Sequence, residues 1–121
     1  TVDAAIDATR IGNTTADAAK FFPPASKWGY KDEAEVLTVE FGHGLGMPVQ
    51  YPVNVPYAMP NVNRQWSLKY PQPFEKNQVI AYESLEGEHR VAGVRLEHMV
   101  VVRETGPEVL DHYPREIITV G

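Results

Sequence analysis

The sequence predicts a single, mainly β domain, built as an antiparallel β-sandwich or a small barrel and preceded by an N-terminal extended or short-helical arm. Two observations predict this class. Hydrophobic residues alternate with polar residues at Leu37–Phe41 and again at Ala92–Val102, which is the pattern of half-buried strands. In addition, about six short strand-like segments, separated by turn residues, follow one another in the later part of the chain, as in sandwiches and barrels.

The composition is that of one soluble domain, with 121 residues of which 43% are hydrophobic and 22% charged. There is no cysteine, which excludes a disulfide framework, a thiolate metal site and a cysteine nucleophile. The net charge is -5 and the basic residues are scattered, so we expect no nucleic-acid partner. No apolar run approaches the ~20 residues of a membrane helix, and no signal-peptide pattern opens the chain. We therefore expect a soluble protein of cytoplasmic synthesis without a membrane span.

Residues 1–31 form the predicted arm, and residues 32–121 form the predicted β domain. The pattern from Thr1 to Thr9 predicts one short helix, and the pattern from Thr15 to Phe22 predicts a second, because prolines follow it. Helices this short are marginal in isolation. We therefore expect the arm to dock on its own domain or on a neighbouring subunit. The side chains expected to make this contact are Ile6, Ile11, Phe21 and Phe22.

A second predicted contact region lies between residues 48 and 60, where proline recurs at every fourth position. In an extended chain these even-numbered positions place their backbone nitrogens on one side, and a proline nitrogen has no hydrogen to donate. The segment is therefore predicted to be an edge strand or a polyproline-like arm, and not a central strand. The interface residues expected here are Pro48, Pro52, Pro56 and Pro60.

The remaining elements follow from alternation and turn residues. Gly42–Gly46 is predicted to be a turn after the strand that ends at Phe41. Gly93 is expected to introduce a bulge or bend into a long strand, and residues 107–112 are expected to form a short helical turn. Further strands are predicted at 65–70, 78–84, 90–104 and 116–120, and the turn between the second and third of these is expected at residues 86–88.

No motif in the sequence points firmly to catalysis or to a metal. Glycines around His43 would allow a ligand to approach its ring, but short motifs of this kind are weak, and an exposed turn histidine is favoured. His89 and His98 are nine residues apart, so in a regular strand their rings point to opposite faces. We therefore predict no catalytic residue, no cofactor and no metal site. A pair of carboxylates is left open, because the spacing of glutamates along strands does not show which of them meet.

The sequence therefore favours a structural or assembly subunit over an enzyme. A virus-particle coat or cement (decoration) protein would fit this pattern. Its arm and its proline segment would lie on further copies of the chain or on a larger structural protein. Such a protein would be located in the virion. The alternative is a small β-barrel that binds a ligand or catalyses a reaction. Its site would lie near His43 and His98, with Trp66 and Tyr82 close to the mouth of the barrel.

Overall fold

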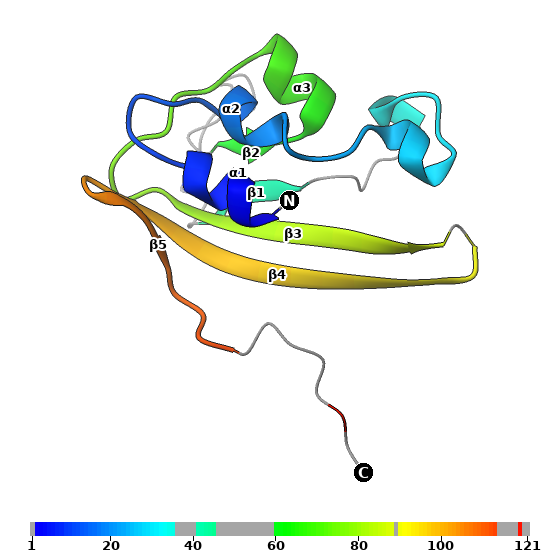
Figure 1. Ribbon diagram of the computed structural model, residues 1–121. Coiled ribbons are helices and arrows are strands. Elements are labelled where there is room, and N and C mark those ends of the chain that lie inside the picture. Colours follow the sequence, from blue (N-terminus) through cyan, green and yellow to red (C-terminus); the bar gives the residue numbers. More distant parts are fainter. Residues whose placement is uncertain (1, 36–40, 46–59, 89, 114–118, 120–121) are drawn as a thin grey trace.

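The fold is described from a computed structural model, which places residues 2–35, 41–45, 60–88, 90–113 and 119. In this part of the chain, five strands form one open sheet in the order β2-β1-β3-β4-β5, and each neighbouring pair is antiparallel. The helices lie on one side of this sheet (Figure 1). The strands are β1 (Gly42–Leu45), β2 (Asn61–Val62), β3 (Val79–Glu88), β4 (Ala92–Arg103) and β5 (Gly106–Val109).

The helices are short, and each depends on contacts with the rest of the chain. Before α2, the carboxylate of Asp17 accepts hydrogen bonds from the backbone N–H of Thr14, at 2.9 Å, and from its hydroxyl, at 3.0 Å. This arrangement satisfies groups that a helix start leaves unpaired. None of the helices in the described ranges is long and apolar enough to cross a membrane. The helices are α1 (Val2–Ala8), α2 (Thr15–Ala19), η1 (Ala25–Trp28), η2 (Glu33–Glu35) and α3 (Arg64–Lys69), of which η1 and η2 are 3-10 helices.

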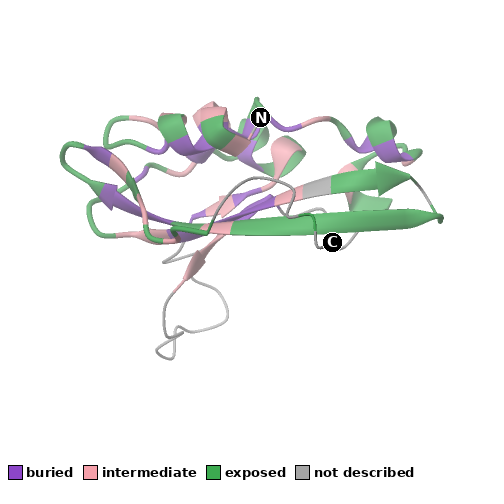
Figure 2. Ribbon diagram, turned by 60° about the horizontal axis from the view of Figure 1, so that its bottom comes forward, coloured by how far each residue is buried: buried purple, intermediate pink, exposed green. Residues whose placement is uncertain are grey.

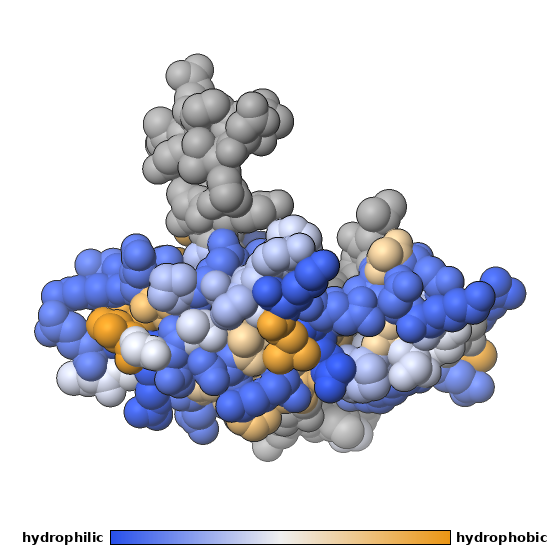
Figure 3. Space-filling view, turned by 90° about the horizontal axis from the view of Figure 1, so that it is seen from above, coloured by the Kyte–Doolittle hydropathy of each residue, from blue (hydrophilic) through white to orange (hydrophobic). Residues whose placement is uncertain are grey.

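The core lies between the helices and one face of the sheet. Successive residues of a strand point to opposite faces, and the even-numbered residues of β3 and β4 point toward the helices. Here the rings of Phe22 and Phe41 stack at 4.4 Å, and the Tyr82 ring lies 6.3 Å from that of Phe22. The buried strand residues of this core are Val62, Ile80, Tyr82, Val100 and Val102. Purple residues in Figure 2 mark this layer, and the outer surface above it is mainly hydrophilic with small separate apolar patches (Figure 3).

The prediction of a mainly antiparallel β fold with a few helices is confirmed. The prediction of a small barrel is wrong, because β2 and β5 are the two edges of an open sheet and do not pair with each other. A sandwich is not confirmed, since helices cover the apolar face of the sheet and no second sheet does so in the described residues. The alternating patterns indicated strands correctly, but they do not determine whether a sheet closes, which depends on strand tilt and stagger.

Individual elements were predicted with mixed success. The helices near residues 1–9 and 15–22 and the strands near 78–84 and 90–104 are confirmed. The expected bulge at Gly93 is wrong, because the β3–β4 register runs without interruption and places Gly93 opposite Gly87. Gly87 has a φ of 155°, and a Cβ there would collide with the carbonyl of Ala92. The hairpin therefore needs glycine at this position.

Three other predictions of local structure are wrong. Where a strand was expected at 65–70, the chain forms helix α3 (Arg64–Lys69). Gly42–Leu45 forms strand β1 instead of a turn, and β5 takes the place of the expected helical turn. In β1, Gly42 lies against the ring of Tyr82, where a side chain would not fit easily. The glycine that resembled a turn signal therefore permits a close approach within the sheet. The strands expected at 37–41 and 116–120 lie outside the described residues, except for Phe41 and residue 119.

The predicted contact residues divide into two groups. Ile6 and Phe22 are buried in the core that the strands share, whereas Ile11 and Phe21 are 49% and 39% exposed. Pro60 is buried and its carbonyl accepts the N–H of Gly44 at 2.8 Å. An interface role for these residues and a domain boundary at residue 31 both stay predictions. Three of the predicted interface residues lie outside the described ranges, namely Pro48, Pro52 and Pro56.

Candidate metal centre

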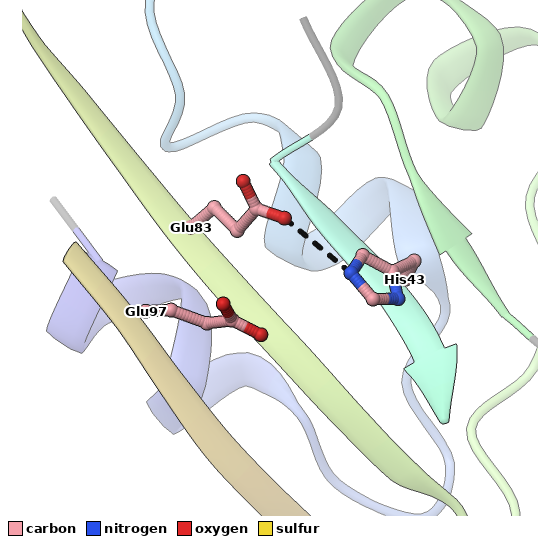
Figure 4. A group of neighbouring side chains, drawn as sticks. All are labelled: His43, Glu83 and Glu97. Atoms are coloured by element: carbon pink, nitrogen blue, oxygen red, sulfur yellow. Dashed lines mark ion pairs between the residues drawn. The ribbon is translucent and has the colours of Figure 1, made fainter. Parts of the chain in front are cut away.

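Odd-numbered residues of β3 and β4 point to the face of the sheet that the helices leave open. Glu83 of β3 lies directly opposite Glu97 of β4, and residues opposite each other in an antiparallel pair share a face. On the other side of β3, His43 of β1 lies opposite Ala81. Ala81 is two residues before Glu83, so both point to the same face of the sheet, and His43 shares that face. Three adjacent strands thus bring one imidazole and two carboxylates together on this open face (Figure 4).

The three side chains are close enough to share one ion. The Nε2 atom of His43 lies 3.4 Å from Oε1 of Glu83. One ligand atom from each of His43, Glu83 and Glu97 falls within 4.8 Å of the other two. Glu83 is buried, with 9% of its surface exposed, while His43 is half-buried and Glu97 is exposed. The cluster therefore has a protected inner side at Glu83 and an open side at Glu97.

Arg95 fixes one of the two oxygens of Glu83. It lies two residues before Glu97 on β4, and its Nη1 contacts Oε2 of Glu83. This contact leaves Oε1 of Glu83 directed toward His43. Carboxylate ligands of metal ions are themselves held by hydrogen bonds or ion pairs in this way.

The charge pattern of the cluster would suit a bound cation. Two like charges directly opposite each other on a sheet are destabilising, and a buried carboxylate needs compensation. Glu83 and Glu97 face each other in this manner. Arg95 and His43 both lie beside Glu83. Nitrogen and oxygen donors of this kind suit Zn²⁺ and Mn²⁺. Two atoms that each lie about 2.0–2.2 Å from one zinc ion are at most ~4.4 Å apart, so small side-chain movements would form the site.

His98 points away from this cluster. As an even-numbered residue it lies on the opposite face from Glu97, directly across from Tyr82. Its Nδ1 is 2.6 Å from Oδ2 of Asp111, whose Oδ1 accepts the backbone N–H of Met99 at 2.9 Å. Burial opposes ionisation of Asp111, but the hydrogen bonds from His98 and Met99 outweigh it and lower the pKa of this carboxyl. The expected combination of His43 with His98 in one site is therefore not formed.

Sequence reasoning missed Glu83 and Glu97 because it did not establish the register of the hairpin. The turn was expected at residues 86–88, whereas the β3–β4 ladder continues to the pair Glu88 and Ala92. Only this later turn brings Glu83 opposite Glu97. Both glutamates are odd-numbered, which the sequence shows. With the turn placed correctly, this would have indicated that the two carboxylates lie opposite each other on one face of the hairpin.

Among known proteins, similarity to this chain was found in solved structures, and not in family models or curated sequences. No family model matches the sequence, and no curated protein matches it. The prolidase from Pyrococcus furiosus is similar with a TM-score of 0.60 and 21% identity, over 94% of this chain and 30% of that one. The dipeptidase PepE from Mycobacterium ulcerans is similar with a TM-score of 0.58 and 26% identity, over 97% and 28%. The X-Pro aminopeptidase from Thermotoga maritima is similar with a TM-score of 0.56 and 27% identity, over 98% and 30%.

These structures overturn the expected function. The three similar proteins are peptidases, so the expectation of a virus-particle coat or cement protein, together with its place in a capsid or virion, is wrong. The expectation rested on the predicted arm and proline segment and on the absence of a recognisable motif, and none of these excludes a part of an enzyme. The chain spans less than a third of the length of each of these three solved chains.

Proposed function

We propose that this chain is the part of a metal-dependent peptidase in which His43, Glu83 and Glu97 ligate a divalent cation. The observation that carries the proposal is the convergence of these three side chains on the open face of a sheet whose fold is similar to three peptidases. A divalent cation bound there would polarise a peptide carbonyl and lower the pKa of a bound water to about 7.

Each residue has a distinct part in this proposal. His43 would bind through Nε2, the atom that already faces Glu83, and so would carry its proton on Nδ1. Glu83 would bind through Oε1 while Arg95 holds its other oxygen, so the ligand is oriented before the cation arrives. Glu97 is exposed and lies on the side from which water and substrate can approach.

The first experiment measures cation binding directly. We expect isothermal titration with Mn²⁺ and with Zn²⁺ to show about one high-affinity ion per chain, because carboxylate and imidazole donors suit both ions. Glu83→Gln, Glu97→Gln and His43→Ala should each lower the affinity strongly. The matched control is Glu86→Gln, which removes a carboxylate from the same strand β3 but from an exposed ion pair with Lys27 at 2.9 Å.

Two results would contradict the proposal. One is an absence of binding by a chain whose circular dichroism shows it folded. The other is equal affinity in Glu83→Gln and in Glu86→Gln. Either result would mean that the cluster is a set of ion pairs among Glu83, His43 and Arg95 without a metal.

The second experiment addresses the reaction. The names of the similar proteins direct the choice of substrates to X-Pro peptides and dipeptides. The complete gene product should hydrolyse such a peptide in the presence of Mn²⁺ or Zn²⁺, and chelation with EDTA should abolish the activity. Cation binding without hydrolysis of any dipeptide would support the metal centre and contradict the peptidase.

A further inference from the structure

A cavity lies between helix α3 and the short helix η2, apart from the candidate metal centre. Its volume of about 340 Å³ is near the lower end of the range of small-ligand sites. Its lining shares no residue with the cluster of His43, Glu83 and Glu97. The polar and aromatic residues that line the cavity are Glu33, Asn63, Gln65, Trp66, Lys69 and Tyr70.

Two hydrogen bonds hold Glu33 in place at this cavity. The N–H of Gln65 donates to Oε2 of Glu33 at 2.7 Å, and the N–H of Glu33 donates to Oε1 of Gln65 at 3.2 Å. The other carboxylate oxygen, Oε1 of Glu33, is buried and has no hydrogen-bond partner. A buried carboxylate oxygen is costly when it is unpaired, and a cationic N–H donor is the partner that stabilises it most.

Asn63 provides a second unpaired acceptor. It precedes α3, and asparagine in this position usually accepts an N–H from the second or third residue of the helix. Here the N–H of the second residue, Gln65, donates to Glu33 instead, and the side chain of Asn63 forms no cap. The Oδ1 atom of Asn63 is buried without a hydrogen-bond partner. The cavity therefore offers two acceptor oxygens to a ligand.

Two aromatic rings of the lining add a surface that attracts cations. Trp66 and Tyr70 are 45% and 46% exposed, and their ring centroids are 4.5 Å apart. The Nζ atom of Lys69 already lies 5.1 Å from the centroid of the Tyr70 ring, which is within cation–π distance. Lys69 is exposed and its stem is flexible, so it can turn toward solvent when another cation binds.

The electrostatic surroundings of Glu33 also favour a further cation. Burial raises the pKa of Glu33, and the hydrogen bonds from the backbone of α3 and the charge of Arg64 offset this only in part. The charge of Arg64 is the smallest of these influences. A cation bound against Oε1 would compensate the carboxylate more directly, because it would lie at hydrogen-bond distance.

We propose that this cavity binds a guanidinium group, such as the side chain of an arginine in a peptide. Its N–H groups would donate to Oε1 of Glu33 and to Oδ1 of Asn63, and its plane would lie against the aromatic rings. A guanidinium suits this lining better than an ammonium, because it is planar, stacks on aromatic faces and carries five N–H donors in a rigid fork. The proposal depends neither on the metal centre nor on peptidase activity, so each can fail separately.

NMR titration of the chain, without added divalent cation, tests the proposal. The probe is N-acetyl-arginine amide, whose ends are uncharged. We expect saturable shift changes at the backbone N–H of Gln65 and at the indole N–H of Trp66. N-acetyl-citrulline amide has nearly the same shape without the charge, and it should bind at least about tenfold more weakly. Methylguanidinium separates two sources of the ligand: equal affinity would assign the cavity to small guanidinium compounds, and weaker affinity would assign it to a peptide side chain.

Two variants locate the binding. Glu33→Gln replaces the charged acceptor by a neutral amide and should weaken binding about tenfold. The matched control is Glu35→Gln, because Glu35 belongs to the same helix η2 but accepts the N–H of Lys31 at 2.8 Å and does not line the cavity. Trp66→Ala should weaken binding about two- to fivefold, and since Trp66 is partly exposed, its circular dichroism should match that of the wild type.

Four outcomes would overturn the proposal. The first is an absence of saturable shifts at Gln65 and Trp66 in a chain that circular dichroism shows to be folded. The second is equal binding of the arginine and citrulline compounds, which would remove the role of the charge. The third is equal affinity in Glu33→Gln and Glu35→Gln. The fourth is tighter binding of N-acetyl-lysine amide, which would assign the cavity to an ammonium group.

Discussion

The two faces of β3 and β4 differ although they are made by the same residues in alternation. On the covered face, Tyr82 and Val100 are completely buried among aromatic and aliphatic side chains. On the open face, Glu83 and Glu97 face each other beside Arg95 and His43. Neighbouring residues such as Tyr82 and Glu83 therefore have different surroundings, one in the packed core and the other in the charged cluster.

This difference teaches how a small sheet can position a charged site. The polar cluster needs strands that do not move relative to one another, and the covered face supplies that rigidity. The hydroxyl of Thr9 donates to the carbonyl of Ala5 at 2.9 Å, so the hydroxyl of Tyr82 donates to Thr9 at 2.7 Å. Burial raises the pKa of Tyr82, which keeps the phenol protonated as this donor. We therefore expect substitutions on the covered face to change stability, and those on the open face to change cation affinity.

The largest effect is expected from Tyr82→Ala. Removal of a completely buried aromatic side chain leaves a cavity, and such changes lower the free energy of unfolding by about 3–5 kcal/mol. Urea denaturation followed by circular dichroism measures this loss. Tyr82→Phe is the control, because it removes only the hydrogen bond to Thr9 and should lower the free energy of unfolding by about 1 kcal/mol. Equal losses in the two variants would show that the ring does not anchor the covered face.

A smaller loss of stability is expected from Gly42→Ala. A Cβ at this position would lie 3.0 Å from two ring carbons of Tyr82 and 3.2 Å from the carbonyl oxygen of Ala81. Overpacking of this kind lowers the free energy of unfolding by about 1–3 kcal/mol. Gly93→Ala is the matched control, since its nearest contact would be an ordinary 3.5 Å. The comparison of the two faces would be weakened if both variants were equally stable in the same denaturation experiment.

On the open face, Arg95→Met should change affinity more than stability. Arg95 is partly exposed and contacts Glu83, so its loss leaves that carboxylate less well oriented. Loss of such a supporting contact typically lowers metal affinity by about 10–100-fold, which isothermal titration with Mn²⁺ would detect. Arg103→Met is the control, because Arg103 pairs with Glu108 at 2.6 Å away from the cluster. A fall in thermal midpoint without a fall in affinity would assign Arg95 a purely structural part.

The smallest effect is expected from Asp17→Asn, in the first turn of helix α2. The hydrogen bonds from Thr14 lower the pKa of Asp17 below its usual value, although its side chain is partly exposed. A group whose pKa is lower in the folded state than in the unfolded state stabilises the fold at pH values above its unfolded-state pKa. This stabilisation is lost as the pH falls through the folded-state pKa. The variant should therefore be slightly less stable at pH 6 and should lose less stability than the wild type on acidification below about pH 4. Thermal midpoints at pH 3 and pH 6 measure the difference, and identical pH dependence in both proteins would contradict the expectation.

Much of the sheet was accessible to sequence reasoning, while the site was not. Alternation over Ala92–Val102 is produced by the burial of one side of a strand, so it is visible without knowledge of the partner. Helix α3 was missed because the spacing of Trp66 and Tyr70 fits two structures. Residues four apart lie on the same face of a strand, and they also lie about one turn apart on a helix. In the structure the two ring centroids are 4.5 Å apart. A pattern of so few residues does not distinguish the two periods.

The sequence by itself determined the antiparallel β class, the two long strands and the short N-terminal helices, because each depends on residues close together in the chain. Only the tertiary structure decided the turn between β3 and β4, the strand identity of Gly42–Leu45 and hence the meeting of His43, Glu83 and Glu97. The physical reason is register, since a shift of one residue moves every side chain of a strand to the other face. Whether His43 is an exposed turn residue or part of a charged cluster thus depends on pairings between segments about 40 residues apart, which no local pattern records.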